Sequence, residues 1–427
     1  MRSLFFILLI SGLAFSCKQN KISVEIRKEG DQYKLFRNGE PYFIKGAVTF
    51  RTNIDKVKEY GGNSLRMHRW NREYLDKAHD MGLSVLLHLP VKPERDGFNY
   101  DDEEAVKLQH DNVISIVKEF LDHPAILIWE LGNELDFVGH MIEPNWKVYE
   151  AVNDLAKEIH EIDPNRPVLT VAGSINQQKI SKLMEMCPDI DLIGINDYAD
   201  LLKIKKWIRD FGWVKPYLVT EWGPSGFWQV PRTDWGIPIE ETSSEKAGLY
   251  KLRYEDGILG DPDMCLGSYV FLWRQHQEQT HTWFGMFDEE WRETGAVDVM
   301  HYEWTGSWPK NLAPIIESIT MDGNTSADNI RIKPGEVHQT IVEVIDPEND
   351  ELTFKWEIIP ENTKFGYGGR GEKKQSPVNV ITGKNNQRNV TFRSPEMPGS
   401  YRIFVYIYDG HNHFSTANIP FLIEVLE

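Results

Sequence analysis

Two short apolar runs in this chain each end in a glutamate. They are Ala125-Ile-Leu-Ile-Trp-Glu-Leu-Gly-Asn-Glu134 and Lys215-Pro-Tyr-Leu-Val-Thr-Glu221. Apolar runs of this length, flanked by helical patterns, are typical of strands buried on both faces. A carboxylate at the end of each strand suits a retaining glycosidase, in which one carboxyl protonates the leaving oxygen and the other attacks the sugar from roughly 5–5.5 Å away. The pair therefore predicts two-carboxylate glycoside hydrolysis.

Each glutamate alone is equally well explained as a solvated strand end, and the two together favour chemistry. A general acid must hold a proton near neutral pH, although the pKa of a free Glu is about 4.3. Burial and a neighbouring carboxylate both raise that pKa. The nucleophile must stay ionised, which a cation such as Arg66 and a tyrosine hydroxyl would favour.

The elements around these runs alternate regularly. Eight short apolar segments alternate with helical patterns across roughly residues 42–310, and this order predicts an α/β fold with a (β/α)₈ (TIM) barrel. An open doubly wound sheet is the alternative, but the chain shows no Gly-rich phosphate turn near its start. In a barrel, chemistry lies at the carboxyl ends of the strands. The polar and aromatic residues predicted there are Arg66, His88, Asn133, Glu134, Asn196, Tyr198, Glu221 and Trp273.

Four motifs in this order resemble the clan A glycoside hydrolases, and most of all the catalytic barrel of family 2. They are Asn38-Gly-Glu-Pro-Tyr-Phe-Ile-Lys-Gly46, Trp129-Glu-Leu-Gly-Asn-Glu134, Asp191-Leu-Ile-Gly-Ile-Asn-Asp-Tyr198 and Leu218-Val-Thr-Glu-Trp-Gly223. The resemblance implies that Glu134 is the acid/base, that Glu221 is the nucleophile and that Asn133 binds the sugar 2-hydroxyl. It also implies that Tyr198 holds the nucleophile, that Arg66 lies beneath it and that Trp273 floors the site.

The resemblance is to the barrel alone. Typical family 2 enzymes carry a jelly roll and an immunoglobulin-like domain before the barrel, and these 427 residues show neither pattern. Because of this difference, the resemblance does not predict the substrate, but the predicted mechanism is unchanged.

Aromatic loops after the last two strands suggest sugar platforms. The chain has 14 Trp, and the candidates are Trp228, Trp235 and Trp283, with the alternative that each ring packs its loop onto the barrel. His276 and His281 lack further ligands at metal-binding spacing, so we expect no metal and no cofactor.

The predicted substrate is a neutral β-linked oligo- or polysaccharide. The net charge of −18 disfavours nucleic acid and anionic glycans, and only Arg232 and Arg274 stand near the site to hold a uronate. Trp loops on two sides favour a cleft, and thus an endo-β-1,3-glucanase. The alternatives are an exo-acting β-galactosidase- or β-mannosidase-like enzyme, a glucanosyltransferase, or a non-catalytic glycan-binding surface lipoprotein. We expect a monomer.

The two ends of the chain differ from the barrel segment, for which we expect residues 22–312 including an N-terminal hairpin. Residues 1–16 resemble a lipoprotein signal peptide, Cys17 the lipidated residue, and 17–21 a tether. The prediction is an exported bacterial lipoprotein that faces the periplasm or the outer surface; an ordinary signal peptide with an incidental Cys is the alternative.

Residues 313–427 show short alternating strands and resemble immunoglobulin- or cadherin-like sandwiches. Asp346 and Asp350 leave a calcium site open in this domain. Cys187 and Cys265 lie beside apolar stretches and are predicted to be buried free thiols.

Overall fold

The computed structural model describes residues 22–50, 53–137 and 143–424. The predicted signal peptide, Cys17 and the tether lie outside these residues. Within the described ranges, no helix combines the length and apolar character needed to span a bilayer.

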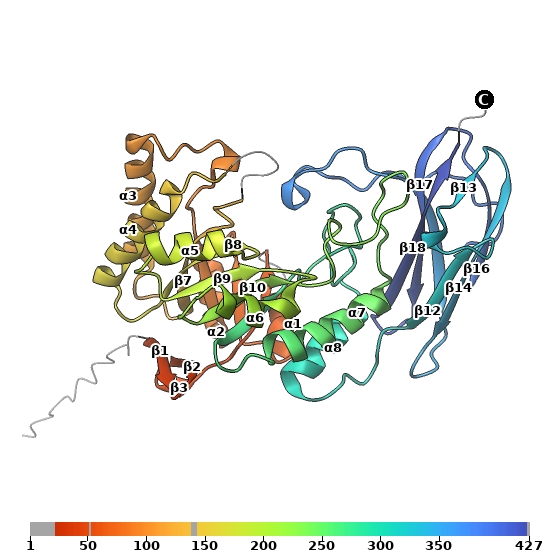
Figure 1. Ribbon diagram of the computed structural model, residues 1–427. Helices are drawn as coiled ribbons and strands as arrows, with labels where there is room; N and C mark the ends of the chain where they lie inside the picture. Colours follow the sequence, from red (N-terminus) through yellow and green to blue (C-terminus); the bar gives the residue numbers. More distant parts are fainter. Residues whose placement is uncertain (1–21, 51–52, 138–142, 425–427) are drawn as a thin grey trace, which may run out of the picture.

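Among the described residues, eight parallel strands close into a barrel, which confirms the predicted fold class (Figure 1). Each strand pairs with the next along the chain, and the last pairs with the first. The strands are β4 (Ile44–Thr49), β5 (Ser64–Met67), β6 (Ser84–Leu89), β7 (Ile126–Asn133), β8 (Val168–Gly173), β9 (Leu192–Asn196), β10 (Tyr217–Trp222) and β11 (Cys265–Val270).

Helices surround this barrel, and capping side chains fix where several of them begin. Asn71 accepts a hydrogen bond from the Tyr74 N–H at the start of α2, and Thr242 and Glu245 form a capping box at the start of α7. The helices are α1 (Ile54–Glu59), α2 (Arg72–Asp80), α3 (Glu103–Phe120), α4 (Lys147–Ile162), α5 (Gln177–Met186), α6 (Leu201–Asp210), α7 (Ser243–Leu252) and α8 (Gly295–Thr305). A π-helical turn, η2 (Arg253–Ile258), extends α7, and a 3₁₀ turn, η1 (Glu94–Asp96), follows β6.

The barrel strands bury both of their faces. One apolar cluster lies between the strands and the helices, and a second fills the barrel interior with residues such as Leu127, Leu169 and Leu218. The N-terminal hairpin, β1 (Val24–Glu29), β2 (Gln32–Arg37) and β3 (Glu40–Pro41), adds Val24 and Leu35 to the interior cluster. The hairpin therefore helps to close the barrel at the end opposite the carboxyl ends of the strands. Cys187 and Cys265 are buried free thiols, as predicted.

The C-terminal part is a sandwich of two sheets with its own apolar core. One sheet has the order β12 (Ile315–Met321), β14 (Val337–Ile345) and β16 (Asn389–Arg393). The other has the order β13 (Arg331–Ile332), β18 (Phe414–Ile423), β17 (Gly399–Tyr408) and β15 (Thr353–Pro360). Two 3₁₀ turns, η3 (Ser326–Asp328) and η4 (Tyr367–Gly369), lie in its connections.

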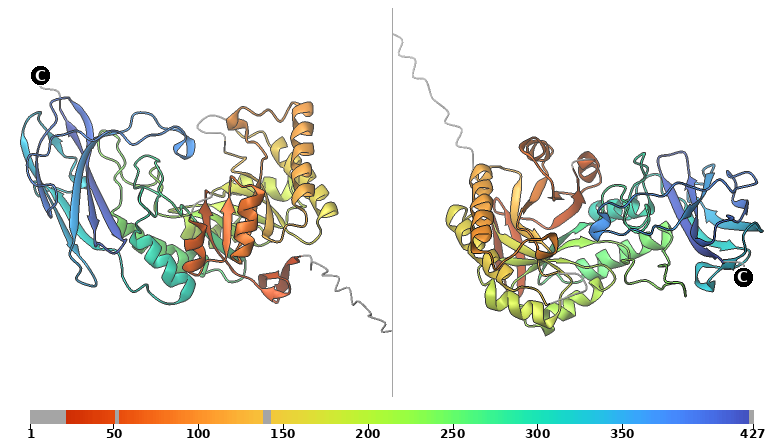
Figure 2. Two further views of the ribbon diagram at one scale, coloured as in Figure 1. Left: turned by 180° about the vertical axis from the view of Figure 1, so that it is seen from behind. Right: turned by 90° about the horizontal axis from the view of Figure 1, so that it is seen from above.

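The sandwich packs against the α7–α8 side of the barrel (Figures 1 and 2). Ser243 and Ser244 of α7 accept hydrogen bonds from the Thr416 and Ile316 N–H groups, each at 2.9 Å. Buried Glu240 accepts from Lys246 at 2.6 Å and from Asn418 of β18 at 2.9 Å. Charged and polar groups buried in this way are costly unless they are paired, and so the paired groups favour one fixed docking of the two domains.

Candidate active site

Glu134 follows β7 on a turn of unusual backbone geometry. Gly132 and Glu134 have φ of 71° and 49°, and positive φ is uncommon for a residue other than glycine. Arg95 of η1 holds this turn: its guanidinium donates to the Asn133 carbonyl at 3.0 Å and to the Phe137 carbonyl at 3.2 Å, and also contacts the Glu134 carbonyl. A strained backbone persists only where its surroundings hold it, and Arg95 does so here.

Two asparagines orient the Glu134 carboxyl. The Asn196 side-chain N–H₂ donates to Glu134 Oε1 at 2.7 Å and to Asn133 Oδ1 at 3.0 Å. The Thr220 hydroxyl donates to Asn196 Oδ1 at 2.8 Å, which fixes the direction of that amide. Asn133 and Asn196 therefore lie beside the predicted acid/base.

Glu221 lies on β10 and is 8% exposed. Its Oε1 accepts from Arg66 Nη1 at 2.6 Å and lies 3.5 Å from His68 Nε2, and its Oε2 accepts from the Tyr198 hydroxyl at 3.3 Å. Arg66 and Tyr198 thus take the places that the family resemblance implies, and they fix the carboxylate from both oxygens.

Arg66 links Glu221 to Glu134 in one hydrogen-bond network, in which Asn133 and Asn196 connect it to Glu134. This arginine is fully buried on β5 and donates to Asn133 Oδ1 at 2.8 Å as well as to Glu221. It also forms a bidentate pair with Glu130 of β7, at 2.6 and 2.8 Å. Such fork-to-carboxylate pairs are the strong, geometrically specific kind of ion pair.

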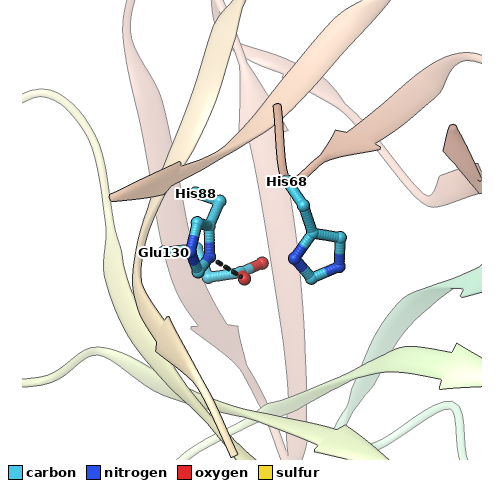
Figure 3. A group of neighbouring side chains, drawn as sticks. All are labelled: His68, His88 and Glu130. Carbon is cyan, nitrogen blue, oxygen red and sulfur yellow. Dashed lines mark hydrogen bonds and ion pairs between the residues drawn. The ribbon is translucent and has the colours of Figure 1, made fainter. Parts of the chain in front are cut away.

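His88 of β6 extends the network through Glu130. Its Nδ1 lies 2.8 Å from Glu130 Oε1, and the His68 ring stands beside it (Figure 3). The ligand atoms of His68, His88 and Glu130 lie within 4.8 Å of one another, a spacing that could hold a metal ion. Both Glu130 oxygens, however, already accept from Arg66. The arrangement is therefore better described as an ion-pair network.

The pKa values of Glu134 and Glu221 are shifted in opposite directions. Burial, and then the charge of Glu221, raise the pKa of Glu134 above its ordinary value. Burial alone would raise the pKa of Glu221, but the hydrogen bond from His68 and the Arg66 charge outweigh it, so this pKa is lowered. Burial also lowers the pKa of His68, which keeps that ring neutral near pH 7. The surroundings thus move the two pKa values apart and favour the protonated form of Glu134 and the ionised form of Glu221, which are the forms required of an acid and a nucleophile.

The aromatic candidates divide into two groups. Trp228 is 53% exposed and stands edge-on to Tyr198, with ring centroids 5.6 Å apart, so its face is available at the mouth of the site. Trp273 lies just beyond β11, fully buried and stacked on Trp304. A ring without exposed surface belongs to the core and cannot touch a sugar directly.

The structure does not place Trp235 and Trp283 at the mouth, which corrects their prediction as sugar platforms. Trp235 donates to Ser400 Oγ of the sandwich at 3.1 Å and so serves the domain interface. Trp283 is 1% exposed and donates to the Ser225 carbonyl at 2.9 Å. It lines a cavity of about 110 Å³ between the domains, and neither Glu134 nor Glu221 lines that cavity. Both rings pack loops, the alternative that the sequence left open.

Sequence reasoning missed four residues of this site: Glu130, His68, Arg95 and Tyr367. A charge inside the apolar run before Glu134 was the available signal for Glu130, and a histidine two residues after Arg66 was the signal for His68. The Tyr367 hydroxyl donates to Glu134 Oε2 from the sandwich domain, 233 residues away along the chain. No local pattern in the sequence indicates that contact.

Comparisons with known proteins agree with this geometry. The family described as "Glycosyl hydrolases family 2, TIM barrel domain" matches residues 82–227, which include both glutamates. A β-glucuronidase of Paenibacillus borealis is 24% identical over 340 residues, covering 67% of this chain and 53% of that protein. A β-galactosidase of Oenococcus oeni is 25% identical over 308 residues, covering 61% of this chain and 28% of that protein. The chain thus spans about half or less of these relatives.

Solved structures agree at the level of the fold. A Bacteroides uniformis β-glucuronidase superposes with a TM-score of 0.51 at 15% identity, covering 94% of this chain and 48% of that one. A Bifidobacterium dentium β-glucuronidase complexed with coumarin-3-O-glucuronide also gives 0.51, at 16% identity, covering 67% of this chain and 49% of that one.

The closed barrel, with two glutamates at the carboxyl ends of its strands, is similar to the barrels of glycoside hydrolases. More narrowly, the barrel is similar to the catalytic domain of glycoside hydrolase family 2, as the sequence motifs predicted.

Proposed function

We propose that this chain is a retaining, exo-acting β-glycosidase in which Glu134 is the acid/base and Glu221 the nucleophile. The observation that carries the proposal is the buried network that joins both carboxyls while moving their pKa values in opposite directions. Binding alone would require no such separation of protonation states. A non-catalytic glycan-binding protein is therefore the weaker interpretation.

The proposed reaction has two displacements. Ionised Glu221, held by Arg66 and Tyr198, attacks the anomeric carbon while Glu134 gives its proton to the leaving oxygen. Once Glu221 carries the sugar its charge is gone, and this removes one cause of the raised pKa of Glu134. Glu134 then takes a proton from water, which attacks and releases the sugar with its original anomeric configuration.

The expected endo-β-1,3-glucan specificity finds no support. The relatives described above are named β-glucuronidase and β-galactosidase, which favours the exo-acting alternative. The cleft argument rested on three Trp platforms, and only Trp228 is exposed at the mouth. We therefore propose a terminal β-linked sugar as the substrate.

A second candidate, a terminal uronic acid in place of a neutral sugar, rests on Arg274. Its guanidinium lies 4.9 Å above the Phe50 ring, and Phe50 stacks on His68, which contacts Glu221. Burial, and then the charge of Arg69, lower the pKa of Arg274, so two arginine charges lie near this side of the nucleophile. Arg274 donates from Nε to the Gln275 carbonyl at 2.8 Å, and Arg232, the other arginine considered, donates from both Nη atoms to the Gly236 and Phe227 carbonyls of its own loop.

The test compares aryl β-glucuronide, β-galactoside and β-mannoside with laminarin and mannan. We expect turnover of an aryl glycoside, with the β-anomer formed first in the NMR spectrum. Initial inversion, or cleavage of laminarin alone, would contradict the proposal. Arg274→Gln should selectively lower kcat/KM for the glucuronide if the uronic acid candidate is right, and should affect all sugars alike if it is wrong.

We further propose that the chain acts as a monomeric bacterial lipoprotein, with residues 1–16 removed and Cys17 lipidated. The support is the apolar segment before Cys17 and the polar residues after it. Labelling of the full-length chain with a radioactive fatty acid, with Cys17→Ser as the control, tests this.

A further inference from the structure

One long connection of the sandwich reaches the barrel. Residues 361–377 leave the sheet after β15 and return where the Val378 N–H donates to the Ile358 carbonyl at 2.8 Å. Two ion pairs fix the base of this loop, Arg402 with Glu361 at 2.7 Å and Lys374 with Glu357 at 2.9 Å. Figures 1 and 2 show the loop, with its short helical turn η4, extending from the sandwich towards the barrel.

The tip of the loop ends on the acid/base. The Tyr367 hydroxyl donates to Glu134 Oε2, its ring stacks on Phe137 with centroids 5.4 Å apart, and the Arg95 guanidinium lies 4.4 Å from its centroid. Arg95 is the residue that holds the strained turn at Glu134. The barrel and the sandwich therefore share one cluster around the acid/base.

Further contacts anchor the loop to the barrel on two sides of the mouth. On one side, Glu372 accepts from the Gln279 N–H at 2.8 Å, after the last barrel strand. Gly369 has φ of 71°, and a Cβ there would lie 2.3 Å from the Gln277 carbonyl oxygen, so the close approach requires glycine. On the other side, Arg370 pairs with Asp96 of η1 at 3.1 Å.

The two oxygens of Glu134 have different partners. Oε1 accepts from the Asn196 N–H₂ group, which can only donate, so in the acid form the proton belongs on Oε2, where the Tyr367 hydroxyl can change from donor to acceptor. The proton goes from that oxygen to the leaving group. The position of the Tyr367 hydroxyl therefore marks the side of the site on which the leaving group must lie.

We propose that residues 361–377 form the leaving-group side of the active site and that Tyr367 is a positioning residue for Glu134. The exposed rings of Tyr367 and Phe137 then offer apolar surface to a leaving group with a flat or apolar face. By donating to Oε2, Tyr367 stabilises the carboxylate form and opposes the burial that raises the pKa of Glu134. The proposal rests on the glycosidase function given above.

The test uses Tyr367→Phe, with Tyr401→Phe as a matched control, because the Tyr401 hydroxyl donates to the Met397 carbonyl within the sandwich. Both variants are compared with the wild type on a methylumbelliferyl glycoside and on a dinitrophenyl glycoside, whose leaving group departs without protonation. Tyr367→Phe removes a charge-assisted hydrogen bond to the Glu134 carboxylate, which raises the pKa of Glu134. We therefore expect the basic limb of the kcat/KM profile to move to higher pH by about half a pH unit or more. KM for the methylumbelliferyl glycoside should rise after Tyr367→Ala.

Three outcomes separate the possibilities. A shifted limb, with a larger loss on the methylumbelliferyl than on the dinitrophenyl glycoside, supports the proposal. An active wild type together with a Tyr367→Phe variant that matches Tyr401→Phe in pH profile and in both substrates overturns it. A wild type that cleaves no glycoside overturns the proposed function, and the role of Tyr367 with it. Equal thermal midpoints of the two variants show that both are folded.

Discussion

Glu130→Gln is the sharpest perturbation of the buried network that does not touch either proposed reacting group. The side chains have the same shape, but the glutamine has one acceptor oxygen and an N–H₂ group. Glu130 now accepts from Arg66 twice, at 2.6 and 2.8 Å, and lies 2.8 Å from His88 Nδ1. With glutamine, at least one of these contacts sets a donor against a donor.

The magnitude follows from burial. Removing one partner of a buried ion pair costs about 3–5 kcal/mol. Arg66 keeps its pair with Glu221, so we expect Glu130→Gln to lower the free energy of unfolding by about 2–4 kcal/mol. With an unfolding entropy of about 2.1 cal/mol/K per residue, 1 kcal/mol lowers the thermal midpoint of a barrel of this length by about 1.6 °C, which gives a decrease of about 3–7 °C.

The pH dependence gives the prediction a second test. Burial alone would raise the pKa of Glu130, but the charge of Arg66 and its hydrogen bonds lower it. A lowered pKa stabilises the fold above the unfolded value of about 4.3, and this stabilisation is lost as the pH falls from there towards the folded pKa. The difference between wild type and Glu130→Gln should therefore be constant from pH 7 to about 5 and shrink below that.

The assay is calorimetric scanning of both proteins between pH 3 and 7, with Asp111→Asn as the control. Asp111 forms an exposed pair with Lys107, and such pairs contribute about 0–1 kcal/mol. An unchanged midpoint for Glu130→Gln at pH 7, or a difference that persists undiminished to pH 3, would refute the role assigned to this network.

Two further predictions concern activity. The pH profile of kcat/KM should be bell-shaped, rising as Glu221 ionises below the ordinary Glu pKa and falling as Glu134 ionises above it; a single limb would contradict the assignment. Trp228→Ala should raise KM roughly 3–10-fold with little loss of stability, whereas Trp283→Ala should cost about 3–5 kcal/mol in unfolding free energy, because only Trp228 is exposed. Steady-state kinetics and denaturant unfolding of both variants test this pair, and equal effects would contradict it.

The barrel and its two glutamates could be predicted because they depend on local pattern and on one geometric rule. Buried parallel strands read as apolar runs, and a barrel brings the carboxyl ends of all its strands to one face. Glu134 and Glu221 each end such a run, so their meeting follows from the order of elements. Arg66, Asn133, Asn196 and Tyr198 follow by the same rule.

The loop residues could not be predicted in this way. Whether Trp235 or Trp283 contacts a sugar depends on what packs over its loop. Here Trp235 donates a hydrogen bond to the sandwich, and Trp283 donates to the loop at Ser225. Tyr367 reaches Glu134 from another domain, and that contact depends on how the two domains dock. The Gly366-Tyr-Gly-Gly369 segment that carries Tyr367 shows no sequence pattern that would indicate a partner in the barrel.

The roles of the two glutamates are tested most directly by azide rescue of Glu134→Ala and Glu221→Ala, followed by NMR of the glycosyl azide formed from an activated aryl β-glycoside. With Glu221 removed, azide attacks from the vacated face and should give the α-azide. With Glu134 removed, azide meets the intermediate on Glu221 and should give the β-azide. The opposite pair of anomers, or full activity in either variant without azide, would contradict the account.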